Sequence, residues 1–281
     1  MELQMFKRAS VGVLLAATAY GAWAAPITFT FNPSGSSPSL NASAGPFTAD
    51  RAVVGNFSSI DILSNNPGVN NFTEQGFLPV TAFTLGGTSV GTPVNQAGGY
   101  GLYISFTATG SQNGPLPTMI GQTTTGSFSS LTYSLIGVPG QPANFVINPN
   151  GTVSVVNNPG AFVLATGSLV NPGGNSLTLT AAGLLPAAQV AANFNPNPSQ
   201  SGFFVNPSAS MQLLLDAAFT NTSSVISTQA LAGGGTRVTI NGGGGNTTLS
   251  AIPEPSTYAM LLAGLGVMGF MMRRRVGAAR H

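Results

Sequence analysis

Short runs of alternating apolar and polar residues recur through the middle of this chain. In Ile27-Thr28-Phe29-Thr30-Phe31 every second residue is apolar, which is the pattern of a half-buried strand. Comparable runs rich in Val, Ile, Thr, Phe and Tyr cover residues 102–107, 127–136, 162–170, 176–181, 211–220 and 237–240. Asn-Pro pairs at eight positions separate many of these runs and favour turns. No apolar stripe of helical period is long, although Ala187–Ala192 is compatible with one or two helical turns.

This pattern predicts an all-β body over residues 25–240, built as a β-sandwich or in a jelly-roll-like arrangement. The composition does not change along the body, so one domain is the default, with two small sandwiches as the alternative. A glycine-rich stretch at residues 241–252 follows, and its composition predicts a flexible linker.

The N-terminal segment has the three parts of a secretory signal peptide. Lys7 and Arg8 are followed by an apolar run over residues 11–20 and then by Ala22-Trp23-Ala24. Small residues at Ala22 and Ala24 fit the positions that a signal peptidase reads, so cleavage is expected before Ala25. An uncleaved membrane anchor is the alternative, but about ten apolar residues are too few for a span, which needs about twenty. Residues 1–24 are therefore predicted to be a signal peptide.

The C-terminal segment also has three parts. Pro253-Glu254-Pro255 is stiff and cannot lie inside a helix. Residues Tyr258–Met272 are uncharged and mostly apolar, which predicts a short transmembrane helix. Arg273-Arg274-Arg275 follows, and clustered arginines stay on the cytoplasmic side of a membrane. Residues 276–281 would then be a cytoplasmic tail, with the body facing outward. An ordinary tail anchor is the alternative.

These three parts, in this order at the end of a chain, resemble the PEP-CTERM sorting domain, a tail also catalogued as the ice-binding protein C-terminal type. The resemblance covers residues 253–275. It implies that an exosortase of an exopolysaccharide-producing Gram-negative bacterium processes the precursor near Pro253, Glu254 and Pro255. It also implies transient anchoring in the inner membrane, with release to the cell surface or extracellular matrix.

Only 5% of the residues are charged, against roughly 25% in an average soluble domain. The body has four acidic residues, Asp50, Asp61, Glu74 and Asp216, and two basic ones, Arg51 and Arg237. A nucleic-acid-binding protein needs a basic patch to neutralise phosphates, so this class is excluded.

Little catalytic chemistry remains. The chain has no Cys, its one His is His281, and the body has no Lys, so thiol, imidazole and amine chemistry are unavailable there. The four carboxylates leave glycoside hydrolysis as the remaining enzymatic option. Asp50 is expected in a local turn or ion pair with Arg51, and Asp61 is expected to face solvent. No catalytic, cofactor-binding or metal-binding residue is predicted, and no cofactor.

Two functions of different classes fit the body. The first is a structural or adhesive protein of an exopolysaccharide-associated biofilm or floc. Phe29–Pro33 and Ala218–Thr222 also resemble segments of flocculation-associated PEP-CTERM proteins. The alternative is a carbohydrate-binding module or lectin for the cell's own exopolysaccharide, with Tyr100, Tyr103 and Tyr133 as candidate stacking residues. The scarcity of charged strand edges leaves self-association of copies open.

Overall fold

The structure of the chain is a computed structural model. It describes residues 26–63, 68–156, 158–181, 183–208, 213–220, 225–251 and 265. The chain divides into two units, one comprising residues 26–250 and the other the two end segments, 1–25 and 251–281. The predicted signal peptide and most of the predicted sorting tail lie outside the described residues. No helix among the described residues is both long enough and apolar enough to cross a membrane.

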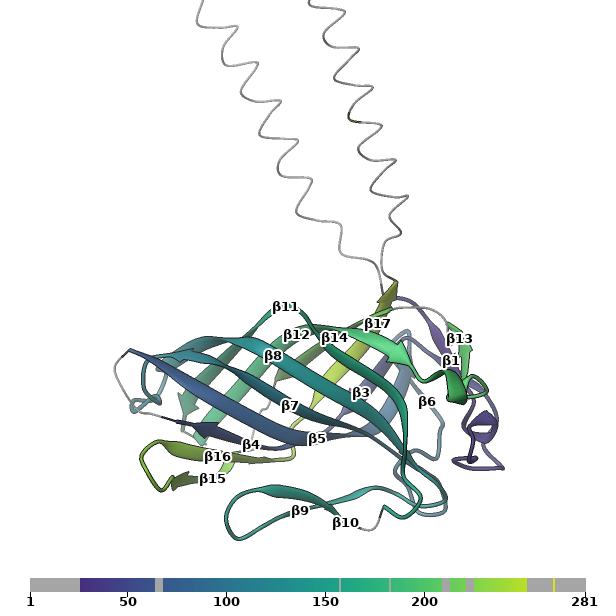
Figure 1. Ribbon diagram of the computed structural model, residues 1–281, viewed down its shortest axis with the longest axis horizontal. Helices are drawn as coiled ribbons and strands as arrows, with labels where there is room; N and C mark the ends of the chain where they lie inside the picture. The colour runs from purple at the N-terminus through teal and green to yellow at the C-terminus, as the bar shows by residue number, and fades with distance from the viewer. Residues whose placement is uncertain are drawn as a thin grey trace, which may run out of the picture. The chain divides into compact units, whose positions relative to one another are not determined.

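The prediction of an all-β body is confirmed. The strands, with two 3-10 turns between them, are β1 (Phe29–Phe31), η1 (Pro33–Gly35), β2 (Phe47–Ala49), β3 (Arg51–Val54), β4 (Phe57–Ile62), β5 (Val69–Leu85), β6 (Thr88–Val90), β7 (Gly101–Asn113), β8 (Thr123–Val138), β9 (Asn144–Ile147), β10 (Val153–Val156), β11 (Phe162–Thr180), β12 (Gly183–Pro196), η2 (Pro198–Gln200), β13 (Phe204–Asn206), β14 (Leu213–Thr220), β15 (Val225–Ala230), β16 (Thr236–Asn241) and β17 (Gly245–Ala251). Figure 1 labels most of these elements.

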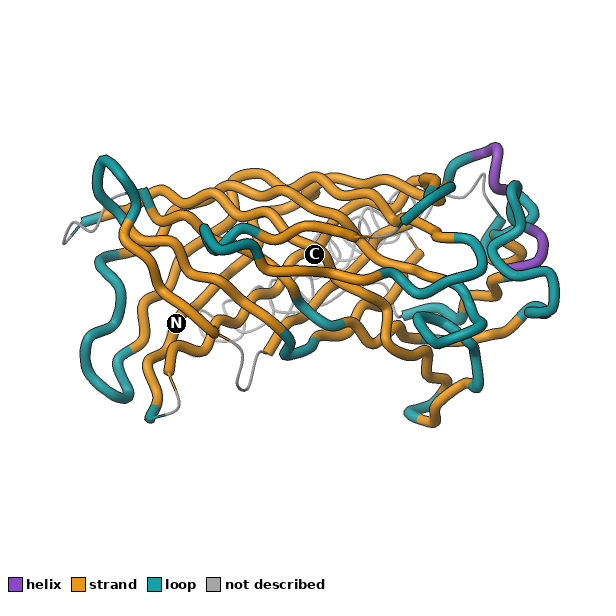
Figure 2. The backbone as a smooth tube through the Cα atoms, turned by 90° about the horizontal axis from the view of Figure 1, so that it is seen from below, coloured by secondary structure: helices purple, strands orange, loops and turns teal. Residues whose placement is uncertain are grey.

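The largest sheet closes on itself. Its order is β15-β16-β4-β5-β3-β17-β14-β12-β11-β8-β7, and β7 pairs in turn with β5. Strands β3, β5, β7, β8, β11, β12, β14 and β17 therefore form a ring in which each strand pairs with its two neighbours. Closure leaves these strands without a free edge, which removes a site for aggregation. Figure 2 shows the strands crossing the body obliquely, with loops gathered at both ends.

Alternation along the strands separates an apolar interior from a polar exterior. In β5, Phe72, Leu78 and Val80 are buried, whereas Asn71 and Thr73 are exposed. Most buried side chains of the ring strands form one apolar core, whereas Tyr103 of β7 and Val138 of β8 belong to a second, smaller cluster. Close approach inside the ring requires glycine at some positions: a Cβ on Gly167 of β11 would overlap the Tyr133 ring and the Asn193 carbonyl.

One end of the ring is closed by aromatic side chains. The small sheet β13-β1-β2 brings Phe31 against Phe203, with ring centroids 4.9 Å apart, and both lie in the core with Phe29. Phe83, near the end of β5, packs edge-on against Phe29 and Phe31 at 6.1 and 6.2 Å. This Phe cluster blocks access to the interior from that end.

The β9–β10 hairpin covers part of the outside of the sheet. Phe145 of β9 stacks on Phe57 and Phe77, with centroids 5.2 and 5.6 Å apart. Arg237 of β16 donates from Nη1 to the Asn150 carbonyl at 2.9 Å, which holds the hairpin turn against the sheet. Figure 1 shows this hairpin alongside β15 and β16.

Three local predictions are corrected by the structure. Ala187–Ala192 lies within strand β12 rather than in a helical turn, because both neighbouring strands pair with it. Residues 245–251 of the predicted linker 241–252 form β17, which pairs with β3 and β14. Asn171-Pro172 does not end a strand, since it lies at a register shift within β11.

Candidate functional site

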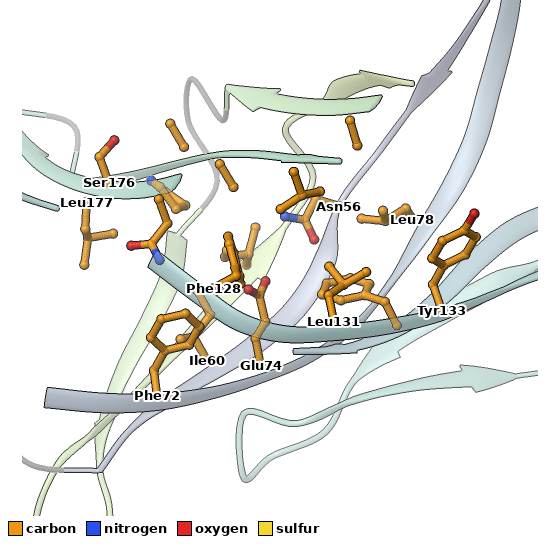
Figure 3. A pocket seen from close by; sticks show the side chains of 18 of the residues that line it. Asn56, Ile60, Phe72, Glu74, Leu78, Phe128, Leu131, Tyr133, Ser176 and Leu177 are labelled. Atoms are coloured by element: carbon orange, nitrogen blue, oxygen red, sulfur yellow. The ribbon is translucent and has the colours of Figure 1, made fainter. Parts of the chain in front are cut away.

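The ring encloses an apolar cavity, which is the most distinctive site in the described part of the chain. The volume open to water-sized molecules is about 100 Å³. Side chains from seven ring strands and from the adjoining strands β4 and β16 line it; the ring strands are β5, β7, β8, β11, β12, β14 and β17. Its apolar wall includes Ile60, Phe72, Leu78, Phe128 and Leu131, which Figure 3 shows around a central space.

One carboxyl group projects into this apolar space. Glu74 of β5 has the same phase as the buried Phe72 and Leu78, so it faces inward. Its cross-strand partners are Ile60 on β4 and Ala108 on β7, both apolar. Figure 3 shows the Glu74 carboxyl directed between the apolar side chains of the cavity.

Burial makes the ionised form of Glu74 unfavourable. Loss of hydration raises the pKa of Glu74 from 4.5 to about 7, and the nearby Ser58 hydroxyl offsets part of this rise. That hydroxyl forms no well-aligned hydrogen bond, and loss of hydration is the larger of the two effects. The Glu74 side chain is half-buried, and its accessible part faces the cavity. Protein surrounds the carboxyl on all sides, so it is removed from bulk water. Among the described residues the salt bridge is that of Arg237 with Asp61, so no cation neutralises Glu74.

Three amide side chains add polar atoms to the cavity wall, namely Asn56, Gln112 and Asn175, and two of them have an unpaired atom. Asn56 Oδ1 and Asn175 Nδ2 are both buried and make no hydrogen bond within the protein. Asn56 is 5% exposed, and its unpaired oxygen costs free energy unless another molecule donates to it. Tyr133 also lines the cavity, but its hydroxyl is satisfied by the Asn193 carbonyl at 2.8 Å.

The remaining carboxylates lie apart from Glu74. Asp61 pairs with Thr73, so it is on the outer face of β4, where Arg237 binds it through two bonds of 2.6 Å. Asp50, between β2 and β3, accepts from the amide of Gly86, which follows β5, at 2.7 Å. Asp216 accepts from the Ser250 hydroxyl at 2.7 Å, between the inward-facing neighbours Leu215 and Ala217. None of Asp50, Asp61 and Asp216 lines the cavity that Glu74 enters, so the cavity does not pair Glu74 with a second carboxylate of the described residues, as glycoside hydrolysis would require.

The three candidate stacking tyrosines are buried. Tyr100, Tyr103 and Tyr133 are 0%, 2% and 5% exposed. Tyr103 packs against Phe77 and Phe145, and its hydroxyl accepts from Asn158 at 3.2 Å. A sugar ring cannot stack on any of these faces, so the structure gives no support to them as a carbohydrate platform.

The sites that the sequence predicted lie outside the described residues. These are Ala22, Ala24 and Ala25 at the signal cleavage site, Pro253, Glu254 and Pro255 in the sorting motif, and Arg273, Arg274 and Arg275 at the cytoplasmic stop. Conversely, sequence reasoning missed the cavity. The available signal was the alternation of Phe72, Glu74, Gly76 and Leu78, which places a carboxyl in phase with apolar residues.

Comparison with known proteins gives one match, at the end of the chain. Residues 251–275 match the family model of the PEP-CTERM protein-sorting motif. Neither a curated protein nor a solved structure matches the chain. The match begins at Ala251, where β17 ends, so the sorting motif follows the folded body directly. The chain thus carries a PEP-CTERM sorting domain, which marks it as an exported protein targeted to an exosortase.

Proposed function

We propose that this protein is a non-catalytic structural or adhesive component of an exopolysaccharide-associated matrix at the cell surface, such as a biofilm or floc. The observation that carries the proposal is the sorting motif at residues 251–275, attached without a linker to a closed β-body. Exosortase sorting accounts for export and for transient anchoring in the inner membrane. The closed sheet supplies a folded body with few free strand edges.

The outer surface of the sheet supports an adhesive role. Exposed hydroxyl side chains cover neighbouring parts of β7 and β8, and we call this set the hydroxyl face: Thr107, Thr109, Thr125, Ser127, Ser129, Ser130 and Thr132. Thr107 and Thr132 bond across the strands at 3.0 Å, and Thr109 bonds Ser130 at 2.7 Å. The face is uncharged, so it can approach neutral polysaccharide hydroxyl groups without desolvating ions.

The first experiment tests sorting. Pro253, Glu254 and Pro255 are replaced together by Ala, and cells are fractionated to follow the size and location of the protein. We expect the variant to remain at precursor size in the membrane fraction, because the apolar segment and Arg273–Arg275 are intact. An Arg273→Gln, Arg274→Gln and Arg275→Gln variant serves as the comparison, since it alters retention but not the motif. Mature protein outside the cell from the first variant would contradict exosortase sorting.

The second experiment tests the role in the matrix. Thr109→Lys and Ser130→Lys together place two charges on the hydroxyl face, whereas Thr88→Lys on β6 is an exposed control elsewhere. We expect the double variant to be exported normally but to release from the matrix more readily than wild type in washes at one fixed salt concentration, because the added charges must be desolvated on contact. Matrix retention and floc size equal to wild type in a correctly exported double variant would refute the adhesive role of this face.

A further inference from the structure

We propose that the cavity inside the closed sheet binds a small uncharged molecule with an apolar body and one hydrogen-bonding group, such as a hydroxyl or an amide. This inference does not depend on the proposed matrix role. It rests on the volume of the cavity, on its wall and on the polar atoms that the protein leaves unpaired there.

The size of the cavity fits one small molecule. It offers about 100 Å³ to water-sized molecules, whereas a single water needs about 10–15 Å³ by the same measure. Apolar cavities of similar size, about 150 Å³, hold one benzene ring. Closed sheets of eight strands commonly have interiors that are either filled by side chains or hold one small ligand.

The wall determines the apolar part of the ligand. The cross-strand row that contains Glu74 runs from Val238 through Ile60 to Glu74, Ala108 and Leu131. Every other member of the row is apolar, so a ligand in contact with it must bury an apolar surface. No Lys, Arg or His is among the cavity-lining residues of the described chain, so a ligand anion has no partner.

The unpaired atoms determine the polar part. Asn56 Oδ1 accepts and Asn175 Nδ2 donates, and neither has a partner within the protein. A hydroxyl or primary amide can both donate and accept, so it can satisfy either atom. The Glu74 carboxyl is a further partner inside the same cavity.

Entry is favoured at the end opposite the Phe cluster. There, exposed apolar side chains lie on the loops and strand ends, namely Leu63, Val69, Met119 and Ile120, which are 52%, 64%, 68% and 73% exposed. The four exposed residues lie near the cross-strand pair of Ile62 and Phe72. Ile62 and Phe72 both line the cavity. The backbone of Gly121 donates to Leu179 at 2.7 Å, which links this loop to the end of β11.

The test uses the purified full chain held in amphipol, with 4-methylphenol as the probe and p-xylene as its analogue without the hydroxyl. Isothermal titration calorimetry measures both. We expect 4-methylphenol to bind and p-xylene to bind about 10-fold more weakly, because one net hydrogen bond is lost. Asn56→Leu is expected to abolish most of this preference while retaining the fold. Absence of 4-methylphenol binding to wild type would overturn the proposal.

A cavity-filling variant locates the site. Ala188→Phe puts a ring into the cavity from β12, and Gln189→Phe adds the same ring on the exposed face of the same strand. We expect Ala188→Phe to weaken 4-methylphenol binding at least 10-fold and Gln189→Phe to leave it unchanged. If circular dichroism shows that Ala188→Phe has not folded, Ala217→Leu is used instead, and it too should weaken 4-methylphenol binding at least 10-fold. Unchanged binding in a folded cavity-filling variant, or equal loss in Gln189→Phe, would show that the probe binds elsewhere and would refute this site.

Discussion

Glu74→Gln should change how the stability of the body depends on pH. The pKa of Glu74 is about 7 in the folded protein and 4.5 as its reference value, so the folded state binds a proton more tightly than the unfolded state. Because the pKa of Glu74 is raised in the folded state, the contribution of Glu74 to the free energy of unfolding is greatest below pH 4.5. It falls as the pH rises from 4.5 to about 7 and is constant above that range.

The magnitude follows from the difference of about 2.5 in pKa, at 1.36 kcal/mol for each unit. Ionised Glu74 thus costs the folded protein about 3 kcal/mol above pH 7. Gln has nearly the same shape but cannot ionise. The variant should therefore exceed the free energy of unfolding of wild type by about 1 kcal/mol or less at pH 5 and by about 3 kcal/mol at pH 8.

Urea unfolding followed by far-UV circular dichroism at pH 5, 6, 7 and 8 measures this effect, since Trp23 is the one tryptophan and precedes the body. Tyr133, the other titratable residue of the described cavity wall, does not ionise in this range because burial raises its pKa. Gln75→Asn is the control: it changes an exposed side chain of the same strand without removing a titratable group, so the wild-type pH dependence should remain. A Glu74→Gln variant that keeps the wild-type slope between pH 5 and 8 would refute the reasoning.

Two further predictions concern close packing at Gly167 and the ion pair of Arg237 with Asp61. Gly167→Ala should destabilise the body by about 2 kcal/mol or more, because the added Cβ overlaps the Tyr133 ring. Gly174→Ala in the same strand is the control, since its Cβ meets nothing within 4 Å and the change should be nearly neutral. Urea unfolding of both variants measures the two effects, and equal effects would refute close packing at Gly167. Arg237→Met should lower the free energy of unfolding by about 1–3 kcal/mol, since it leaves the partly buried Asp61 unpaired and releases the β9–β10 turn. A double-mutant cycle with Asp61→Asn measures the coupling between the two residues, and a coupling of zero would contradict this prediction.

The sequence predicted the elements of the fold better than their assembly. The alternation in residues 27–31 and 127–136 depends on local contacts with one buried face, and strands β1 and β8 lie there. Closure of the sheet depends on two pairings, that of β5 with β7 and that of β17 with β3. The second pairing joins residues nearly 200 positions apart in the sequence. No local pattern encodes such pairings, so the ring could not be derived from the sequence.

The glycine-rich segment shows why β17 was missed. Glycines and Asn at residues 242–246 favour a flexible chain by composition. Gly245 and Asn246 nevertheless pair with Val54 and Val53, and Leu249 of the same strand is buried in the core. Tertiary pairing supplied the order that the side chains did not predict.

The candidate site was hidden for a similar reason. Glu74 stood out in the sequence as one of four carboxylates in the body, but a single carboxyl among apolar neighbours is ambiguous when strand phase is unknown. Its cavity depends on side chains from β8, β11, β12 and β14, which lie far from it in sequence. By contrast, the sorting motif is a contiguous segment, so the sequence was sufficient to identify it.

The arrangement of the chain ends makes sorting and ligand binding separable. Ile27 donates to the Leu249 carbonyl at 2.8 Å, and Pro26 bridges to Ser250, so the two ends of the body leave the sheet at one place. The cavity-lining residues nearest the C-terminus belong to β17, with Thr247 the last of them, whereas the predicted processing motif starts at Pro253. Cleavage at Ala25 and near Pro253 would therefore remove both signals without taking a residue from the ring or the cavity wall. A variant that is defective in sorting should retain the cavity, and a cavity-filled variant that folds should still be sorted.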